Sequence, residues 1–400
     1  MKLPKFKCTA VVLAGIFTVS IPAIARADWS ITGLGASGGT YSVAQAINDS
    51  GQVVGYDNGD GINRAFITGA NGLGMHYLDT LGGTGSYASG INNSGQVVGH
   101  SFTSTGSAHA FITGANGIGM TDLGTLGGNF SDAYGINDFG QVVGVSSIAG
   151  DVAYHAFITG PNGVGMIDLG TLGGDYSTAY GINDSGQVVG SSSIAGSAIQ
   201  HAFITGANGT GMTDLGTLSG TTSSIAWDIN NSGHAVGFSS LYDDYSGYYS
   251  AQAFITGPSS SGVTDLGTPL NSRADGINDF GQVVGGLNSF CDACPHSSFL
   301  YSDHIITDLS LLAPVVSAGW TELSAIAINN HGQIVGWGSL KDSPGGGSRA
   351  FLLSPIAAVP EPDTYAMLLI GLGLLSFLSR RKKEINIVRQ VSIKVRGLSA

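Results

Sequence analysis

The feature that most constrains this chain is a short pattern that recurs seven times. Its clearest copy lies within residues 181–190. After Gly181, the pattern reads Ile-Asn, two variable residues, Gly and then Gln-Val-Val-Gly. Its Asn lies at Asn48, Asn92, Asn137, Asn183, Asn230, Asn278 and Asn329, at spacings of 44, 45, 46, 47, 48 and 51 residues. Periods of roughly 20 to 50 residues are typical of solenoids and propellers, whose repeats cannot bury their apolar faces alone. The repeat therefore predicts one continuous body rather than several domains.

The charge of this body limits its partners. Residues 28–358 contain 24 Asp and Glu residues against four Lys and Arg residues, a formal net charge of −20. Nucleic acids and anionic lipids are bound through clustered cations, so neither is an expected partner of the body. The hydrophobic content of 42% is ordinary, so the chain can bury a core.

Each repeat contains four short apolar segments. In the second repeat these are residues 87–91, 96–99, 109–113 and 120–123. They are rich in Val, Ile, Phe and Thr, span about four to six residues and are bounded by Gly or Asn, which predicts strands. The Asn-x-x-Gly sequence between the first two segments predicts a tight turn with a Gly of positive φ, and Ala115-Asn116-Gly117 predicts another after the third.

The third segment holds one constant and one variable position. Phe is present in all seven copies, whereas the residue two places earlier is Arg64, His109, His155, His201, Gln252, Ser297 or Arg349. A constant aromatic residue predicts a core position, and the variable residue is expected on the same face nearer the strand end. Three His residues do not predict a metal ring, because the copies with Arg or Ser would interrupt it.

The fourth segment predicts how the body closes. This segment reads Asp-Leu-Gly-Thr-Leu-Gly-Gly at residues 122–128. A copy of it is present in each of the first six repeats but not in the seventh, and residues 29–39, ahead of the first repeat, match it. A ring of sheets can use that N-terminal strand to complete its last sheet, but a linear solenoid cannot. The sequence therefore predicts an all-β fold at residues 28–357, a seven-bladed β-propeller with four strands per blade, closed by the N-terminal strand.

Both ends of the chain carry features of export. Residues 1–27 contain three early Lys residues, an apolar run and Ala25-Arg26-Ala27, which predicts a secretory signal peptide. At the other end, Pro360-Glu361-Pro362 precedes an apolar run at 365–378 and the cations Arg380, Arg381, Lys382 and Lys383. The run is short for a membrane span of about 20 residues, and the cations favour a cytoplasmic position for that end. Residues 384–400 form a C-terminal extension.

Two resemblances add to this interpretation. The His-Ala-Phe and Asp-Leu-Gly-Thr-Leu-Gly-Gly segments resemble the HAF repeat of bacterial extracellular proteins over residues 29–355, and residues 358–383 resemble the PEP-CTERM sorting signal of Gram-negative bacteria. The second resemblance implies that an exosortase, a membrane cysteine transpeptidase, recognises Pro360, Glu361 and Pro362 beside the cluster Arg380, Arg381 and Lys382. It further implies contact with the inner membrane before processing, and a periplasmic, extracellular or cell-surface destination. An ordinary C-terminal anchor is the alternative.

Two smaller motifs concern covalent and metal chemistry. Cys291 and Cys294 form a CxxC pair, for which a loop disulfide is expected, with metal binding beside His296 or free thiols as alternatives. Residues 57–61, Asp-Asn-Gly-Asp-Gly, are an oxygen-rich loop without the later Glu of an EF-hand, so calcium binding is a weaker hypothesis. No cofactor is expected.

The sequence favours a structural or binding component of an extracellular matrix or exopolysaccharide layer over an enzyme. A nucleophile elbow, a P-loop and an HExxH motif are missing, and the repeated Asp of the fourth segment recurs too regularly for a unique catalytic pair. Polysaccharide or matrix proteins are the expected partners, with Tyr242, Tyr245, Tyr248 and Tyr249 of the loop 239–250 as candidates for sugar stacking. A propeller enzyme acting on polysaccharide is the alternative.

Overall fold

The computed structural model describes residues 28–35, 41–59, 61–242, 249–258, 262–287, 296–341 and 347–356. The compact body within these ranges spans Trp29–Pro355 and is built almost entirely of β-strands. Its one α-helix in the described ranges is the short α1 (Ala313–Ser317). No helix among the described residues combines the length and the apolar character that crossing a bilayer requires.

The strands form seven consecutive units of four, each following one copy of the repeat. Units 1 to 3 contain β2 (Ser42–Ile47), β3 (Val53–Asp57), β4 (Arg64–Thr68) and β5 (Met75–Tyr77); β6 (Gly82–Ile91), β7 (Val97–Thr103), β8 (Ala108–Thr113) and β9 (Met120–Gly124); and β10 (Gly127–Ile136), β11 (Val142–Ile148), β12 (Tyr154–Thr159) and β13 (Met166–Asp168). Units 4 and 5 contain β14 (Gly173–Ile182), β15 (Val188–Ile194), β16 (Gln200–Thr205) and β17 (Met212–Gly216); and β18 (Ser223–Ile229), β19 (Ala235–Tyr242), β20 (Tyr249–Thr256) and β21 (Val263–Asp265). Units 6 and 7 contain β22 (Arg273–Ile277), β23 (Val283–Leu287), β24 (Ser297–Ser302) and β25 (Ile305–Asp308); and β26 (Trp320–Ile328), β27 (Ile334–Leu340), β28 (Arg349–Ile356) and β1 (Asp28–Gly33).

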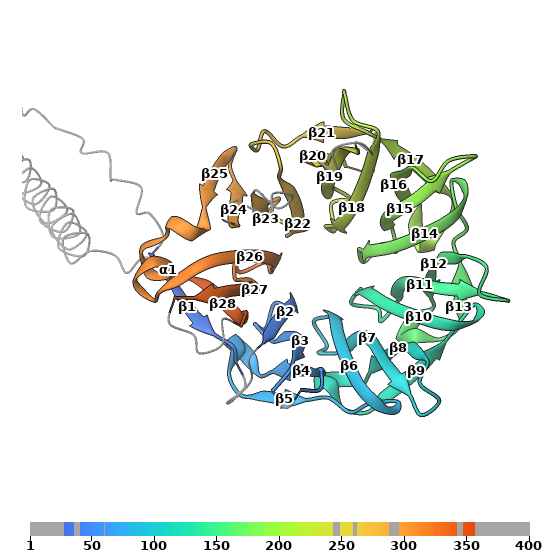
Figure 1. Cartoon of the computed structure of the whole chain (residues 1–400), viewed down its shortest axis with the longest axis horizontal. Helices are drawn as coiled ribbons and strands as arrows, with labels where there is room; N and C mark the ends of the chain where they lie inside the picture. The colour runs from blue at the N-terminus through green and yellow to red at the C-terminus, as the bar shows by residue number, and fades with distance from the viewer. Residues whose placement is uncertain are drawn as a thin grey trace, which may run out of the picture. The chain divides into compact units, whose positions relative to one another are not determined.

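The sheets are open and are arranged around a central axis, with the first strand of each unit innermost (Figure 1). Five units are separate four-stranded sheets. Units 3 and 4 share one eight-stranded sheet, because a single parallel pair, Tyr154 with Tyr176, joins β12 to β14. The fold is therefore all-β and propeller-like.

The N-terminal strand β1 is the outermost strand of unit 7 and lies next to β28. The backbone N–H of Leu34, just after β1, donates to the carbonyl of Ala350 at 2.7 Å. The N–H of Leu78 makes the equivalent bond to Ala65 in unit 1, at 2.8 Å. The segment that matches the fourth segment of the repeat thus occupies the fourth-strand position of the last sheet.

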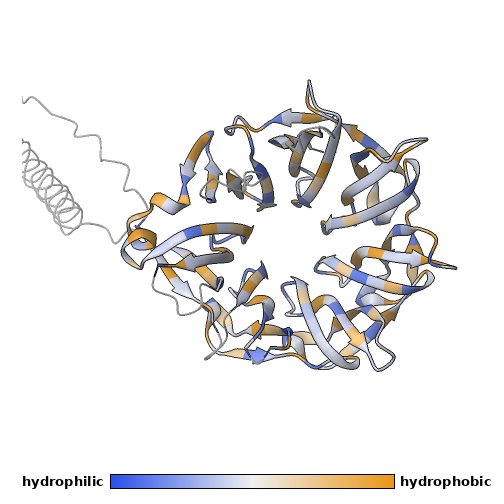
Figure 2. Cartoon of the chain, in the orientation of Figure 1, coloured by the Kyte–Doolittle hydropathy of each residue, from blue (hydrophilic) through white to orange (hydrophobic). Residues whose placement is uncertain are grey.

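The hydrophobic core is divided among the gaps between neighbouring sheets. In one such gap Ile67 and Leu78 of unit 1 pack against Val97 and Phe111 of unit 2. The constant Phe is fully buried in every unit, as predicted for a core position, and burying a Phe side chain contributes about 1.5–3 kcal/mol. A further cluster joins unit 7 to unit 1, with Leu34 among its members. Apolar residues accordingly recur on every sheet around the axis (Figure 2).

Three of the innermost strands are much longer than predicted. β6, β10 and β14 each contain ten residues, where the sequence predicted about four to six. The Gly-Gly pair that the sequence interpretation placed in the fourth segment instead begins the next inner strand. The first of these residues, Gly82 in β6, has a φ of 93°, and a register irregularity follows it. Glycine allows the chain to turn inward there without leaving the sheet.

Two positions of the repeat require glycine for different structural reasons. Gly95, in the Asn-x-x-Gly turn, has a φ of 75°, as the turn pattern predicted. Gly99, in Gln-Val-Val-Gly, lies so close to the inner strand that a Cβ would be 1.9 Å from the carbonyl oxygen of Tyr87. The predicted turn after the third strand is also present, with positive φ at Asn116 and Gly117.

Candidate functional site

The repeated Asn side chains form a closed cycle of hydrogen bonds at one end of the inner strands. Each Nδ2 donates to the backbone carbonyl of the equivalent Asn in the next unit at 2.9–3.1 Å. Asn329 of unit 7 donates in this way to Asn48 of unit 1. The Oδ1 atoms accept backbone N–H groups of their own turns, as Asn92 does from Gln96 at 3.0 Å. Asn fits this position because one side chain supplies both a donor and an acceptor.

A second cycle is made by the residue after each of these Asn residues. Each backbone N–H donates to a side-chain Oδ1 in the next unit at 2.8–3.0 Å. The members are Asp49, Asn93, Asp138, Asp184, Asn231, Asp279 and Asn330. They line a cavity of about 200 Å³. Their carboxylates are engaged by protein donors, and in the part of the chain that the structure describes no three His, Cys, Asp or Glu residues are arranged to hold a metal ion.

A larger cavity, of about 670 Å³, lies among the same inner strands before the Asn positions. We call it the central cavity. It is lined mainly by the residues two and three places before each Asn, all of them except Gly276. The position three places before varies from unit to unit, whereas the position two places before is Gly or Ala in six units and Asp in one. Three places before, the residues are Gln45, Ser89, Tyr134, Tyr180, Trp227, Asp275 and Ile326; two places before, they are Ala46, Gly90, Gly135, Gly181, Asp228, Gly276 and Ala327. The lining therefore differs from unit to unit, whereas the Asn cycle does not.

One wall of the central cavity is an arc of aromatic rings from three consecutive units. The ring centroids of Tyr134 and Tyr180 are 5.3 Å apart, and those of Tyr180 and Trp227 are 4.3 Å apart. Burial raises the pKa of both Tyr hydroxyls, so the two rings remain neutral phenols at neutral pH. The arc offers π faces on which a flat or ring-shaped ligand can stack.

The wall formed by units 5 and 6 carries charge. Asp275 contacts the Nε of Arg273 at 3.1 Å through both carboxylate oxygens. Asp228 accepts the backbone N–H of Ile229 at 2.8 Å and that of Ile277, in the next unit, at 2.9 Å. Burial raises the pKa of each of these two Asp carboxyls to about 6, although the hydrogen bonds to Asp228 and the charge of Arg273 beside Asp275 oppose the shift. Both carboxylates are nevertheless mostly ionised at neutral pH.

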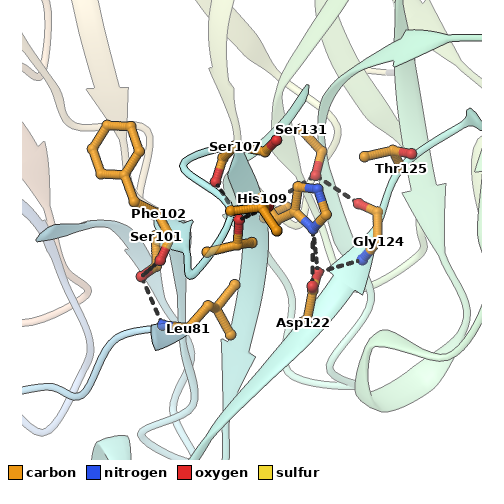
Figure 3. Close-up of polar contacts among 12 residues, drawn as sticks. Leu81, Ser101, Phe102, Ser107, His109, Asp122, Gly124, Thr125 and Ser131 are labelled. Atoms are coloured by element: carbon orange, nitrogen blue, oxygen red, sulfur yellow. Dashed lines mark hydrogen bonds and ion pairs between the residues drawn. The ribbon is translucent and has the colours of Figure 1, made fainter. Parts of the chain in front are cut away.

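The variable residue two places before the constant Phe lies outside the central cavity and pairs with the fourth strand. In unit 2 the Nδ1 of His109 is 2.9 Å from Oδ2 of Asp122, whose Oδ1 accepts the N–H of Gly124 (Figure 3). His155 and His201 make the same contacts to Asp168 and Asp214. Each Asp side chain is 41% accessible. These surface pairs link the third strand to the fourth.

Units 1 and 5, which have no His at this position, keep a contact between the same two positions. Gln252 donates through Nε2 to Asp265 at 2.7 Å. In unit 1, where Tyr77 replaces the Asp, Arg64 lies over the Tyr ring at 5.7 Å from its centroid. In units 2 to 5 the repeated Asp thus links the third strand to the fourth.

Several predicted site residues lie outside the described residues. These are the signal peptide, the sorting-signal residues Pro360, Glu361, Pro362, Arg380, Arg381 and Lys382, the Cys291–Cys294 pair, Asp60, Tyr245 and Tyr248. Tyr242 and Tyr249 lie opposite each other in the β19–β20 pair, so they extend a hairpin. Asp57, of the proposed calcium loop, ends β3, is buried and accepts a hydrogen bond from the hydroxyl of Tyr77 at 3.1 Å.

The sequence interpretation missed the central cavity, although a signal was present. Asp228 is the one acidic residue at a repeat position that is Gly or Ala in the other six units, and Trp227 is the one Trp at its position. Comparing the repeats column by column would have marked both residues. That comparison could not have shown that these repeat positions face a common cavity.

Two family models match parts of the chain. The model described as "Protein of unknown function (DUF3466)" matches residues 217–353, and the PEP-CTERM protein-sorting motif matches residues 358–383. The predicted sorting signal is thereby confirmed as a motif, and it implies export to the cell envelope or surface of a Gram-negative bacterium with processing by an exosortase. A comparison with curated proteins gives no match.

Solved structures with a similar fold include two β-propeller relatives. The propeller domain of the Trilobed protease from Pyrococcus furiosus, described as having an open velcro topology, gives a TM-score of 0.52 at 8% identity, covering 80% of this chain and 100% of that chain. An oligogalacturonate lyase in complex with manganese gives a TM-score of 0.50 at 11% identity, covering 83% of this chain and 94% of that chain. At such low identity the likeness concerns the fold alone.

Proposed function

We propose that this protein is an exported, seven-bladed β-propeller that binds polysaccharide in an extracellular matrix or exopolysaccharide layer through its central cavity. An exosortase processes it near Pro360, and the propeller is then a binding component rather than a catalyst. The PEP-CTERM motif supports the route. The central cavity, whose aromatic and charged lining residues differ from unit to unit, is the observation that carries the binding role.

Three observations support a ring of seven blades closed by β1. The Asn cycle returns from Asn329 to Asn48 over 281 residues. A hydrophobic cluster joins the last unit to the first, as clusters join the other neighbours. β1 supplies the fourth strand that unit 7 otherwise lacks. Closure of this kind protects the sheet edges at both ends of the chain.

Saccharide binding suits the chemistry of the central cavity. Aromatic faces such as those of Tyr180 and Trp227 pack against the apolar faces of sugar rings, and they already lie in an arc. Carboxylate and guanidinium groups accept from and donate to hydroxyl groups, and Asp228, Asp275 and Arg273 line the wall next to this arc. A volume of about 670 Å³ falls within the range of small-molecule sites.

A polysaccharide-cleaving enzyme is the second candidate, favoured by one observation. Asp228 and Asp275 line the same cavity, and both have a raised pKa, as a general acid requires. Each is already held, Asp228 by two backbone N–H groups and Asp275 by Arg273, so a binding role fits them better. Release of new reducing ends from a polysaccharide by the purified protein, lost in Asp275→Asn, would instead establish catalysis.

The binding role is tested by co-sedimentation of the purified full chain with the exopolysaccharide of its producing bacterium. Tyr180→Ala removes the central ring of the arc, and binding should weaken at least about tenfold. Tyr176→Ala is the matched control, because Tyr176 lies on the same strand β14 but is 46% exposed and lines neither cavity. Equal binding by the two variants would contradict a role for the central cavity.

A second variant guards against a folding defect in Tyr180→Ala. Ser89→Tyr places in β6 the residue that Tyr134 and Tyr180 provide at the same repeat position, so the inner strand tolerates it by analogy. The new ring fills part of the central cavity without removing a contact of the core. A changed affinity for polysaccharide, weaker if the ring blocks the cavity or stronger if it extends the arc, with unchanged thermal unfolding supports the proposal, whereas an unchanged affinity of Ser89→Tyr would contradict it.

A further inference from the structure

The charge balance of the central cavity is negative. Its lining contains two carboxylates, Asp228 and Asp275, and one cation, Arg273. Arg273 is already engaged by Asp275 through Nε, at 3.1 Å to each oxygen. Within the described residues, the hydrogen bonds to Asp228 come from two backbone N–H groups, those of Ile229 and Ile277. One negative charge therefore has no cationic partner in the cavity lining.

The surroundings of Asp228 do not compensate this charge. The nearest charged group of the Asn end is Asp279, which adds repulsion, and β22 contributes the Arg273–Asp275 pair. The Tyr hydroxyls of the neighbouring units are neutral at pH 7 because burial raises their pKa. The other described Lys and Arg residues do not line the central cavity: Arg64 lies over Tyr77, Arg349 lies near Gly35, and Lys341 follows β27. Keeping Asp228 ionised in this setting costs free energy, which a ligand cation would offset.

The aromatic arc strengthens the same preference. Trp227 directly precedes Asp228 in β18, and its ring lies 4.3 Å from that of Tyr180. A cation over such faces is attracted by the electron-rich face of the ring, more strongly when water is excluded. A carboxylate next to stacked rings is a combination that favours an ammonium group over a neutral hydroxyl or an anion.

We propose that the central cavity recognises a sugar unit that carries a protonated amine, that is, an amino sugar without an N-acetyl group, with Asp228 as the partner of the amine and Tyr180 and Trp227 as its aromatic platform. This inference rests on the proposed function and narrows its ligand class. An acidic sugar is the opposite case, since its carboxylate would meet Asp228 and a body of net charge −20.

The test compares three probes that differ at one position of the sugar ring. Oligomers of glucosamine, N-acetylglucosamine and glucose of equal length are titrated into the purified full chain by isothermal calorimetry at about pH 7, where Asp228 is ionised. We expect the glucosamine oligomer to bind at least about tenfold more tightly than the other two. Its affinity should fall as salt is raised, because the contact is between charges.

Variants assign the preference to Asp228. Asp228→Asn should reduce the affinity for the glucosamine oligomer at least about tenfold and leave the three probes nearly equal. Asp175→Asn is the matched control: it makes the same change of charge at an exposed site on β14 that lines neither cavity, and should alter no affinity more than about twofold. If Asp228→Asn does not fold, the probe comparison and the salt series on the unmodified chain still decide the matter.

The outcomes separate the two levels of the proposal. Equal affinity for all three probes, changed in Ser89→Tyr, would overturn the amine preference and leave saccharide binding in place. Failure of every probe, together with failure of the native exopolysaccharide to bind, would overturn the proposed function itself. A preference for the glucosamine oligomer that persists in Asp228→Asn would contradict the assignment of Asp228.

Discussion

Leu34 provides the sharpest test of how the N-terminal strand is held. Its side chain is 5% exposed and packs with Ala44 and Ile47 of unit 1 and Leu352 of unit 7. A Cβ on Gly72, in the turn of unit 1, would lie 2.8 Å from Cδ2 of Leu34, so the side chain fills that contact completely. Replacing a buried Leu by Ala costs about 2–5 kcal/mol, and we expect Leu34→Ala to lower the free energy of unfolding by about 2–3 kcal/mol, since β1 is an edge strand.

The measurement is equilibrium unfolding in denaturant of the full chain, with two matched Leu→Ala controls. Leu78, 8% exposed, makes the equivalent contact one unit later, so Leu78→Ala should cost about as much as Leu34→Ala. Leu73 is 72% exposed, and Leu73→Ala should change stability by less than about 0.5 kcal/mol. If Leu34→Ala behaves like Leu73→Ala, the N-terminal strand does not hold the last unit to the first.

Two further predictions concern polar groups. Burial raises the pKa of Asp228 from 3.8 to about 6, so between these pH values the folded protein keeps a proton that the unfolded chain has lost. The stability that this group contributes is therefore full below about pH 4, falls between about pH 4 and 6, and is constant above about pH 7. The fall amounts to roughly 3 kcal/mol at 1.36 kcal/mol per pKa unit, and subtracting the pH profile of Asp228→Asn from that of the wild type should reveal it; parallel profiles would mean that the carboxyl is not desolvated. His155→Gln should keep the contact to Asp168, as Gln252 keeps its contact to Asp265, and change stability by less than about 0.5 kcal/mol, whereas His155→Ala should cost about 1 kcal/mol; equal losses in thermal unfolding would show that Gln does not replace the His.

The repeat made much of the architecture predictable. Strand positions, the turns at Gly95 and Asn116, and the core position of Phe111 follow from alternation and turn chemistry that each unit repeats. The place of β1 followed from a segment that was missing at one end of the chain and present at the other. Inner-strand length was not predictable in this way, because Gly82 and Gly83 resemble a turn but continue as strand.

The candidate site was harder to predict because it depends on contacts between units. The two hydrogen-bond cycles through Asn48 and Asp49 form only because the seven units meet around one axis. The sequence of a single repeat does not indicate this arrangement. Asp228 and Asp275 are 47 residues apart, and the packing of unit 6 against unit 5 brings them to one cavity. The pairing of His109 with Asp122 was also missed, although in unit 1 both positions differ, as Arg64 and Tyr77.

Hydrogen–deuterium exchange with mass spectrometry tests the central claim most directly. The full chain is compared with and without a saturating concentration of fragments of the native exopolysaccharide. Ligand in the central cavity should slow exchange in β14 (Gly173–Ile182) and β18 (Ser223–Ile229), which carry Tyr180, Trp227 and Asp228, and leave the outer strand β17 (Met212–Gly216) unchanged. Slower exchange confined to outer strands, or no change at any strand, would contradict a binding site at the centre of the ring.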